Sequence, residues 1–485
     1  MRLKTFLGWT SSVILCLIYS ITLSAYGFLQ WRWPETPSLF PVASAAPLFL
    51  SLVAFCLLIT RCCRKRGLDI SGYWRGALLV LMCLPIVWIM TDAKPIECDY
   101  CIADVVSNDP EVLKSYDTLM LLRKDGGIKV DETISASNSC RILTQDCTNA
   151  LAYSNEIYRA WDNIADARAI IEKLDFYSGI ADLTSDEQLG TNISVVGFRT
   201  MRRIGHAYAA YARLKTAEGQ PEEAARQLAT LHRVTRKALS HAAILVDKMI
   251  WVAIGNLTIE SAAAMLRDPH CMPQTVEILR AAFPSLAKEE VDLRRVFISE
   301  YLWVKAVFGN ARPSNFIDFF VFEEVGTPQK PPSSFRKWGS GFVYYLSFRK
   351  NRTFRDFRAC FDPCIEGADI CPPDTVSAET AMLYYSAHPD IRNLAGRLLV
   401  AMGVPSFGKA CASVFKTKVL SDLLAIEIGD CLNQPVILDD CYAGAPYGRN
   451  KVTGRAFSVG PDQKPNTADD IVLGADCSCR GQSKN

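Results

Sequence analysis

The stretch AYAAYARLKTAEGQPEEAARQLATL, residues 207–231, decides the fold class of this chain. Small and aromatic residues recur at helical spacing up to Gly219, and Pro221 follows with Glu222 and Glu223 directly behind it. Glycine takes the left-handed conformation that ends many helices, whereas proline and carboxylates favour the first turn of a helix. The stretch therefore predicts two antiparallel helices joined by a tight turn.

This helix pair, over residues 205–236, resembles a tetratricopeptide unit, with small residues where the helices touch and E-E-A-A at the head of the second helix. A solenoid of such units needs about three repeats to bury a continuous core. The sequence contains no second clear copy at the expected period. Two interpretations stay open, a TPR-like unit and an ordinary helical hairpin.

Helical periodicity continues on both sides of the pair, from Asp109 to about Ile428. Apolar residues at spacings of three and four mark buried faces, so the region is expected to be a helical domain. Helices are predicted over residues 144–174, 240–266, 288–308, 342–360 and 376–428, the last interrupted at Gly403 and Pro405.

Three apolar runs precede the helical domain. No charged residue interrupts residues 6–30, 36–60 or 76–91. A membrane-spanning helix needs about 20 mostly apolar residues, so the first two runs are long enough and the third is short. Arg75 and Asp92, at the ends of the third run, can extend to the membrane interface. We therefore predict three transmembrane helices within residues 1–92.

Basic residues set the expected orientation of these helices. Arg2 and Lys4 precede the first run, and five basic residues lie between the second and third runs. The positive-inside rule places both basic segments in the cytoplasm. The chain is thus predicted to be a multi-pass membrane protein whose large domain lies outside the cytoplasm. A cleaved signal peptide is the alternative for the first run, which its length disfavours.

Thirteen of the 18 cysteines lie in the large domain, several in close groups. In an oxidising compartment such usage predicts disulfides, one of them between Cys431 and Cys441. The alternative at Cys98 and Cys101 is zinc, which needs a second Cys or His pair. A redox C-x-x-C would need a thioredoxin-like setting that the sequence does not offer. The pairing of the cysteines stays open.

Motifs of catalysis and of nucleotide binding are missing from the sequence, including H-E-x-x-H, G-x-S-x-G and the P-loop. The 53 basic and 51 acidic residues give no reason to expect a nucleic-acid partner. Catalytic groups that assemble from distant positions would leave no such motif. Two function classes therefore stay open, a non-enzymatic scaffold or interaction protein and an envelope enzyme with dispersed catalytic residues.

The C-terminal residues 429–485 differ from the helical domain. Two short β-like runs, around Tyr447 and over 455–459, predict a small antiparallel element. Behind them stands SVGPDQKPNTADDIVL, residues 458–473, an acidic loop with an apolar run on either side. Its turn-forming residues and its carboxylates predict an irregular loop that closes on itself.

The carboxylates of this loop, Asp462, Asp469 and Asp470, are candidate metal ligands. Ca²⁺ takes six to eight oxygens from carboxylates and backbone carbonyls. The loop has no soft or imidazole ligand, which argues against zinc or copper. We expect calcium, with carbonyls near Val459 and Lys464 completing the shell. The alternative is an acidic turn that faces water.

This ending resembles the C-terminal part of the major pseudopilin of type II secretion systems, over about 35 residues. In that family a strand-leading segment and a later acidic pair bind calcium, so the resemblance implies the same here. A longer likeness links the exported part to uncharacterised bacterial membrane proteins with a helical domain and this same ending. The residues that match the pseudopilin pattern are Phe457, Ser458, Gly460, Asp462, Asp469 and Asp470.

The chain departs from pseudopilins at two places. Its amino terminus lacks the prepilin cleavage signature, and the loop has Gln463, Lys464 and Pro465 where pseudopilins have glycines. Assembly into a pilus-like fibre is therefore not expected.

The sequence as a whole predicts a mainly α protein with three parts. These are a three-helix transmembrane anchor (1–92), an exported helical domain (93–428) and a small β segment (429–485). The expected function is that of a membrane-anchored, periplasm-facing scaffold or interaction protein with a calcium-stabilised loop. Its expected partners are the membrane and envelope or secretion proteins.

Overall fold

The computed structural model describes residues 94–96, 99–122, 147–185, 188, 197–309, 348–368, 393–403 and 407–474. The three predicted transmembrane helices lie outside these residues. The chain divides into two compact units, each of which is described by itself. The larger unit comprises Pro95–Ala311, Phe354–Ala381 and Met402–Asn485, and the smaller comprises Met1–Lys94, Arg312–Thr353 and Met382–Ala401.

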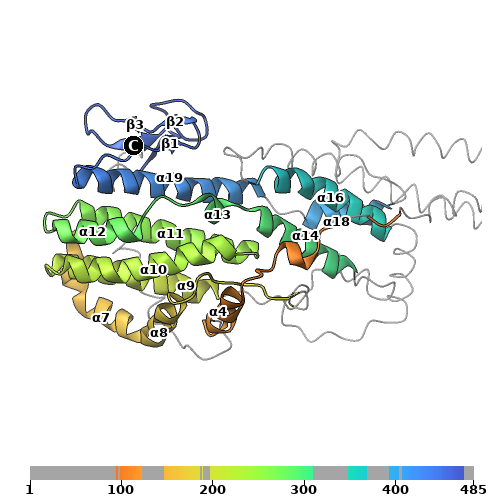
Figure 1. Ribbon diagram of the computed structural model, residues 1–485, viewed down its shortest axis with the longest axis horizontal. Helices are drawn as coiled ribbons and strands as arrows, with labels where there is room; N and C mark the ends of the chain where they lie inside the picture. The colour runs from red at the N-terminus through yellow and green to blue at the C-terminus, as the bar shows by residue number, and fades with distance from the viewer. Residues whose placement is uncertain are drawn as a thin grey trace, which may run out of the picture. The chain divides into compact units, whose positions relative to one another are not determined.

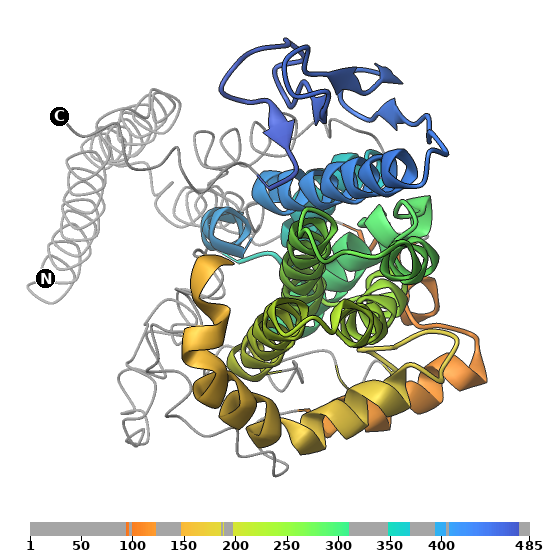
Figure 2. The ribbon, with the colours of Figure 1, turned by 90° about the vertical axis from the view of Figure 1, so that its left-hand side faces the viewer.

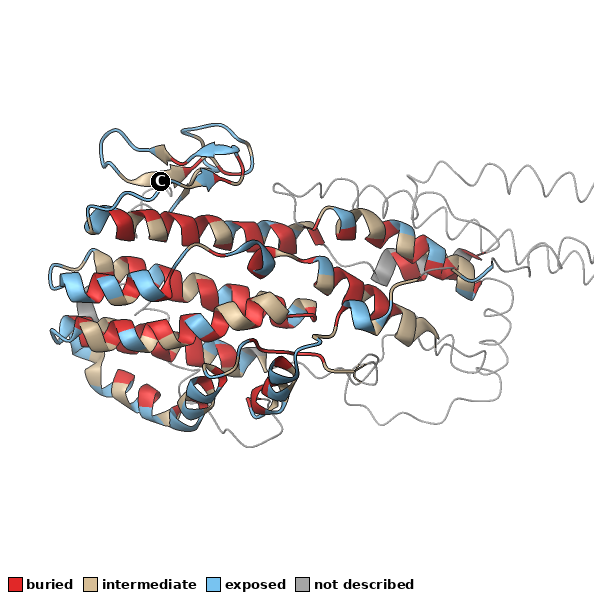
Figure 3. Cartoon of the chain, in the orientation of Figure 1, coloured by how far each residue is buried: buried red, intermediate tan, exposed pale blue. Residues whose placement is uncertain are grey.

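Four long helices form the core of the larger unit and pack side by side (Figures 1 and 2). Buried residues run along all four helices (Figure 3), and Trp251, Tyr208 and Leu228 are almost completely buried. The fold is therefore mainly helical, as predicted. The four helices are α9 (Phe198–Ala217), α10 (Pro221–His241), α11 (Leu245–Leu266) and α19 (Phe407–Cys431).

The predicted helix pair is confirmed as α9 and α10. Gly219 has a φ of +76° between the two helices, a conformation that L side chains rarely adopt. Pro221 occupies the first turn of α10, with Glu222 and Glu223 behind it. The two helices pack against each other, and both contain small buried residues such as Ala209 and Ala224. The turn chemistry thus determines where the pair folds back.

Three predicted helices are broken by short irregular links. The helix expected over 144–174 is instead a 3₁₀ helix followed by two α-helices, with a break at Ile164. The helix expected over 240–266 starts only at Leu245. The helix expected over 288–308 is interrupted at Asp292 and Leu293. The resulting elements are η3 (Cys147–Tyr153), α7 (Ser154–Asn163), α8 (Ala165–Leu174), α13 (Lys288–Val291) and α14 (Arg294–Gly309).

The described residues contain five further helices. Asp109 caps one of them, α4, by accepting the N–H of Glu111 at 2.8 Å. In the smaller unit, the Asn393 side chain accepts the N–H of Arg349 at 2.8 Å and the hydroxyl of Thr353 at 3.0 Å. The elements are η2 (Ile102–Asp104), α4 (Pro110–Met120), α12 (Pro273–Ala282), α16 (Lys350–Glu366) and α18 (Leu394–Gly403).

The C-terminal segment folds into two small antiparallel sheets, as predicted, and lies against α19 on the side away from α10 and α11 (Figures 1 and 2). Sheet pairing sets Phe457 opposite Gly448 and Val472. The first sheet contains β1 (Asp439–Asp440) and β2 (Ala445–Pro446), and the second contains β3 (Gly448–Arg449), β4 (Ala456–Ser458) and β5 (Ile471–Val472) in the order β3-β4-β5.

One helix among the described residues, α11, is long and apolar enough to span a membrane. In its most apolar window, however, 67% of the residues are buried inside the protein. A core helix of a folded domain has the same properties, and α11 packs against α9, α10 and α19. The position of α11 in the core is thus sufficient to account for its composition.

The cysteines that the structure describes are free thiols, and they include both Cys431 and Cys441. The bridge predicted between these two residues is therefore not present in the structure. Cys360 and Cys364, another predicted close group, are also free thiols. The remaining close groups include Cys98, Cys140, Cys371, Cys477 and Cys479, which lie outside the described residues.

Candidate functional site

The predicted site is the loop between β4 and β5. At its entrance the N–H of Val459 donates to the Asp440 carboxylate at 3.0 Å. Farther along, the Asp462 carboxylate accepts the N–H of Lys464 at 3.0 Å. Asp470 accepts the N–H of Asn466 at 2.8 Å. Each of these two carboxylates is therefore used to close a local turn.

The two ends of the loop meet, as the flanking apolar runs predict. Ser458 pairs with Ile471 across β4 and β5. Gly460 has a φ of +66°, and a Cβ built on it would stand 2.1 Å from the carbonyl oxygen of Asp469. Only glycine allows the backbone of the loop entrance to approach the exit so closely.

The three predicted carboxylate ligands do not gather into a ready-made cluster. Within the described residues, no group of three His, Cys, Asp or Glu side chains is placed to hold a metal ion. Asp469 is exposed, whereas one oxygen of Asp470 is buried without a hydrogen-bond partner. The calcium site at Asp462, Asp469, Asp470, Val459 and Lys464 stays a prediction.

Asp440 is a functional residue of the segment that sequence reasoning did not single out. Its side chain is buried, and its two oxygens accept the N–H groups of Tyr442 and Val459, both at 3.0 Å. It thereby joins the turn after β1 to the start of the acidic loop. The sequence signal is the acidic pair Asp439-Asp440 a few residues before Gly444.

Asp422 of α19 attaches the segment to the helical domain. Its carboxylate is buried and accepts hydrogen bonds from Ser285 at 2.5 Å, Lys418 at 2.6 Å and the Tyr447 hydroxyl at 2.9 Å. Burial, followed by the negative charge of Asp422, raises the pKa of Tyr447 far above its usual value. Tyr447 therefore stays protonated and continues to donate. An Asp within an apolar helix was the sequence signal.

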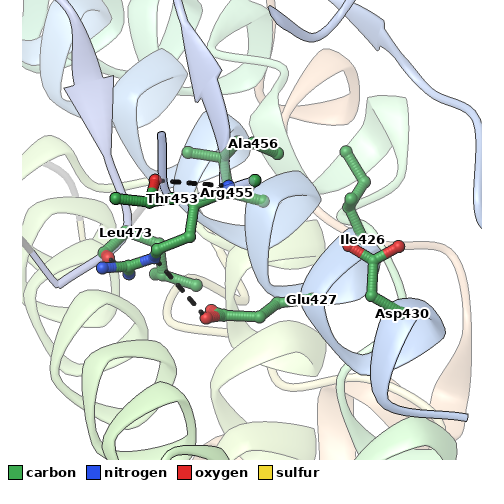
Figure 4. A pocket seen from close by; sticks show the side chains of 9 residues that line it. Ile426, Glu427, Asp430, Thr453, Arg455, Ala456 and Leu473 are labelled. Carbon is green, nitrogen blue, oxygen red and sulfur yellow. Dashed lines mark hydrogen bonds and ion pairs between the residues drawn. The ribbon is translucent and has the colours of Figure 1, made fainter. Parts of the chain in front are cut away.

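A small pocket lies between α19 and the C-terminal segment (Figure 4). Its volume is about 190 Å³, which corresponds to roughly six water molecules. Ligand pockets for cofactors are usually about 300–1,000 Å³, so this one fits water or a single small group. Its lining residues are Leu423, Ile426, Glu427, Asp430, Thr453, Gly454, Arg455, Ala456 and Leu473.

The charges around the pocket are paired. Glu427 accepts two hydrogen bonds from Arg267, at 3.0 and 2.9 Å, and its carboxylate is 3.8 Å from the Arg455 guanidinium (Figure 4). Asp430 forms an ion pair with Arg449 at 2.7 Å. These pairs connect α19 with Arg267 after α11, Arg449 in β3 and Arg455 before β4. The C-terminal segment is consequently attached to α19 by ion pairs that include residues lining the pocket.

A second group of buried charges lies where α10 passes into α11. Asp182 accepts the N–H groups of Ala243 at 2.9 Å and Ile244 at 3.0 Å, directly before α11. Burial raises the pKa of Asp182 to about 6 and lowers the pKa of Lys248 to about 8. Such shifts occur at catalytic sites, but both groups are used here to bind backbone atoms of neighbouring elements.

Lys248 satisfies backbone carbonyls of three segments. Its ammonium donates to the carbonyls of Leu239 at 2.5 Å, Glu290 at 2.9 Å and Asp292 at 3.2 Å. Lys248 is 1% exposed, so these bonds take the place of its hydration. The lysine therefore ties the end of α10 to α13 and to the link that follows α13.

His232 of α10 is almost completely buried. Its Nδ1 lies 2.9 Å from the Thr258 hydroxyl, and its ring stacks on Phe283 with the centroids 4.0 Å apart. Burial lowers the pKa of His232 to about 3, so the ring is neutral at pH 7. His232 thus acts as a core residue of the helical domain.

No family model, curated protein or solved structure matches the chain.

Proposed function

We propose that the chain is a non-enzymatic, membrane-anchored scaffold that faces the periplasm and presents its C-terminal segment to a secretion or envelope protein. One observation carries the proposal. The segment is attached to α19 by buried polar bonds, while Ile437 and Val452 are exposed to 81% and 94%. The inward side of the segment is thus fixed, and apolar side chains remain on its outward side.

The attachment favours a rigid presentation of these side chains. Tyr447 donates to the buried Asp422, Arg449 pairs with Asp430, and Arg455 donates to the Leu473 carbonyl. The first two bonds attach the segment to α19, and the third joins the residue before β4 to the residue after β5 within the segment. A rigid surface loses little conformational entropy on binding, which favours affinity for a partner.

Exposed apolar side chains are unevenly distributed over the described residues. Single exposed apolar residues are ordinary on protein surfaces, but concentrations of them mark interaction sites. The short C-terminal segment contributes four of the nine large apolar side chains that are exposed in the described part of the chain. The four are Val436, Ile437, Val452 and Val472.

The buried charges of the helical domain support the same function. Asp182, Lys248 and Asp422 all bind groups on neighbouring elements. Their bonding capacity is used to hold the domain together, as expected of a scaffold. Calcium at the loop with Asp462 and Asp469 would add a further tie within the C-terminal segment.

Site-specific crosslinking in cells tests this proposal. A photoreactive amino acid placed at 437 or 452 of the full-length chain should give a discrete crosslinked protein after illumination. The control position is Phe176, which is 88% exposed on the helical domain. Crosslinks that are absent at 437 and 452, or equally strong at 176, would contradict the proposal.

A further inference from the structure

Two cysteines that are distant in the sequence lie on stretches of the larger unit that contact each other. Cys271 lies in the turn between α11 and α12, and Cys431 ends α19. Before Cys271, Arg267 donates two hydrogen bonds, at 3.0 and 2.9 Å, to Glu427, which lies one helical turn before Cys431. This contact aligns the end of α11 with the last turns of α19.

A second contact lies on the other side of both cysteines. The Arg280 guanidinium of α12 donates to the side-chain oxygen of Gln434 at 2.7 Å. The stretch that contains Cys271 is therefore bound to the stretch that contains Cys431 both before and after the two thiols.

The backbones at the two cysteines are also fixed. The N–H of Cys271 donates to the Asp268 carbonyl at 3.0 Å. After Cys431, the N–H of Gln434 donates to the Gly429 carbonyl at 2.8 Å, and Asn433 takes a φ of +55°. Both thiols therefore start from backbone positions that hydrogen-bonded turns define.

The pKa shift of Cys271 agrees with these contacts between the two stretches. Burial raises the pKa of Cys271, and the negative charge of the Cys431 thiolate raises it further. Cys431 is exposed and Cys271 is half-buried, so a reagent from solution can reach the pair. Two close, accessible thiols are the substrate of disulfide exchange.

We propose that Cys271 and Cys431 form a disulfide when the chain meets a disulfide oxidant. The Cys431 thiolate attacks the donor disulfide, and one donor sulfur leaves as a thiolate. The Cys271 thiolate then displaces the second donor sulfur. The chain loses two protons and two electrons, and the donor is reduced to its dithiol form.

This bond would join positions 160 residues apart and would fix the turn after α11 to the end of α19. The C-terminal segment starts directly after Cys431, so the bond would secure its point of attachment. The pairing also excludes the bridge between Cys431 and Cys441, because Cys431 can form one bond only. It goes beyond the proposed function and depends on the contacts around α19, not on the location of the domain.

Peptide mapping tests the pairing. The reduced full-length chain in detergent is oxidised with glutathione disulfide, alkylated and cleaved before aspartates. Residues 268–291, 430–438 and 440–461 are then separate peptides, each with one cysteine. We expect the first two peptides to be joined. A link between 430–438 and 440–461, or 430–438 carrying an alkyl group or glutathione, would overturn the proposal.

Cysteine variants give a second readout. Because the bond would close a long loop, reductant should lower the melting temperature of the oxidised chain by about 5–15 °C. Cys441→Ser should keep this sensitivity, and Cys271→Ser should lose it. Equal sensitivity in the two variants would refute the pairing, and if Cys271→Ser does not fold, the peptide map of the wild type decides.

Discussion

At the scale of single residues, the helical domain depends on charges that it buries. Lys248 and Asp422 are each about 1% exposed, yet each binds three groups from different parts of the chain. A buried charge is stable only when such partners replace water. Removing one of these side chains should therefore leave several polar groups without a partner.

Lys248→Met tests this dependence. Methionine fills a similar volume but leaves the carbonyls of Leu239, Glu290 and Asp292 without their donor, so the variant should be less stable by about 3 kcal/mol. The matched control is Lys173→Met at an exposed position, which should change stability by less than about 0.5 kcal/mol. Urea unfolding followed by circular dichroism measures both. Equal stabilities would show that the three bonds contribute nothing.

The same lysine predicts a dependence on pH. Burial lowers the pKa of Lys248 to about 8, from the ordinary lysine value of 10.5 that applies in the unfolded chain. Between these two values the unfolded state binds more protons, so this lysine makes stability rise as the pH increases. Lys248→Met should lack that rise in unfolding experiments from pH 8 to 10.5.

At the scale of elements, the turn at Gly219 could be predicted because its signal is local. The breaks before α11 and within the 288–308 region could not. No Gly or Pro marks them, and the start of α11 is set by Asp182, which lies about 60 residues earlier and accepts the N–H groups of Ala243 and Ile244. Long-range bonds of this kind leave no periodic pattern in the sequence.

In the candidate site, too, the features with a local sequence signal were predictable and those that depend on long-range contacts were not. The closed loop was predictable, since apolar runs flank it and Gly460 stands at its entrance. The roles of Asp422 and Asp440 were not, because each depends on a partner that the fold brings from another element, Tyr447 for the first and Val459 for the second.

Gly460→Ala tests the close approach within the loop. Alanine would be strained at φ +66°, and its Cβ would collide with the Asp469 carbonyl oxygen, so we expect a loss of about 2–4 kcal/mol. Gly444→Ala is the matched control, because Gly444 has a φ of +63° but nothing within 4 Å of the added Cβ. It should cost only about 1 kcal/mol. Equal losses in thermal unfolding would remove the steric explanation.

Calcium binding by the loop between β4 and β5 is tested by thermal unfolding. A ligand that binds only the folded state raises its stability, so millimolar calcium should raise the melting temperature of the full-length chain in detergent above its value in EDTA. Asp462→Ala and Asp469→Ala should abolish the increase, whereas the exposed Asp439→Ala, outside the loop, should keep it. Identical wild-type curves in calcium and EDTA would identify the loop as a solvated acidic turn.

At the scale of the whole molecule, the proposal depends on which side of the membrane the helical domain occupies. An export-dependent reporter fused after Asp104 should be active, and the same reporter fused at Lys65 should be inactive, because the basic link between the second and third runs is expected in the cytoplasm. An inactive fusion after Asp104 would rule out the three-span arrangement and with it a periplasmic scaffold.

The core helix α11 has a consequence for biosynthesis. An exported domain would have to carry this segment through the translocon, although its length and hydropathy satisfy the requirements of a stop-transfer sequence. Asp247 and Lys248 lie in its first turn, where a charge opposes lateral release into lipid by less than the roughly 3 kcal/mol that it would cost at the centre of a span. The charges that the folded domain buries would thus also weaken the tendency of α11 to stop in the bilayer.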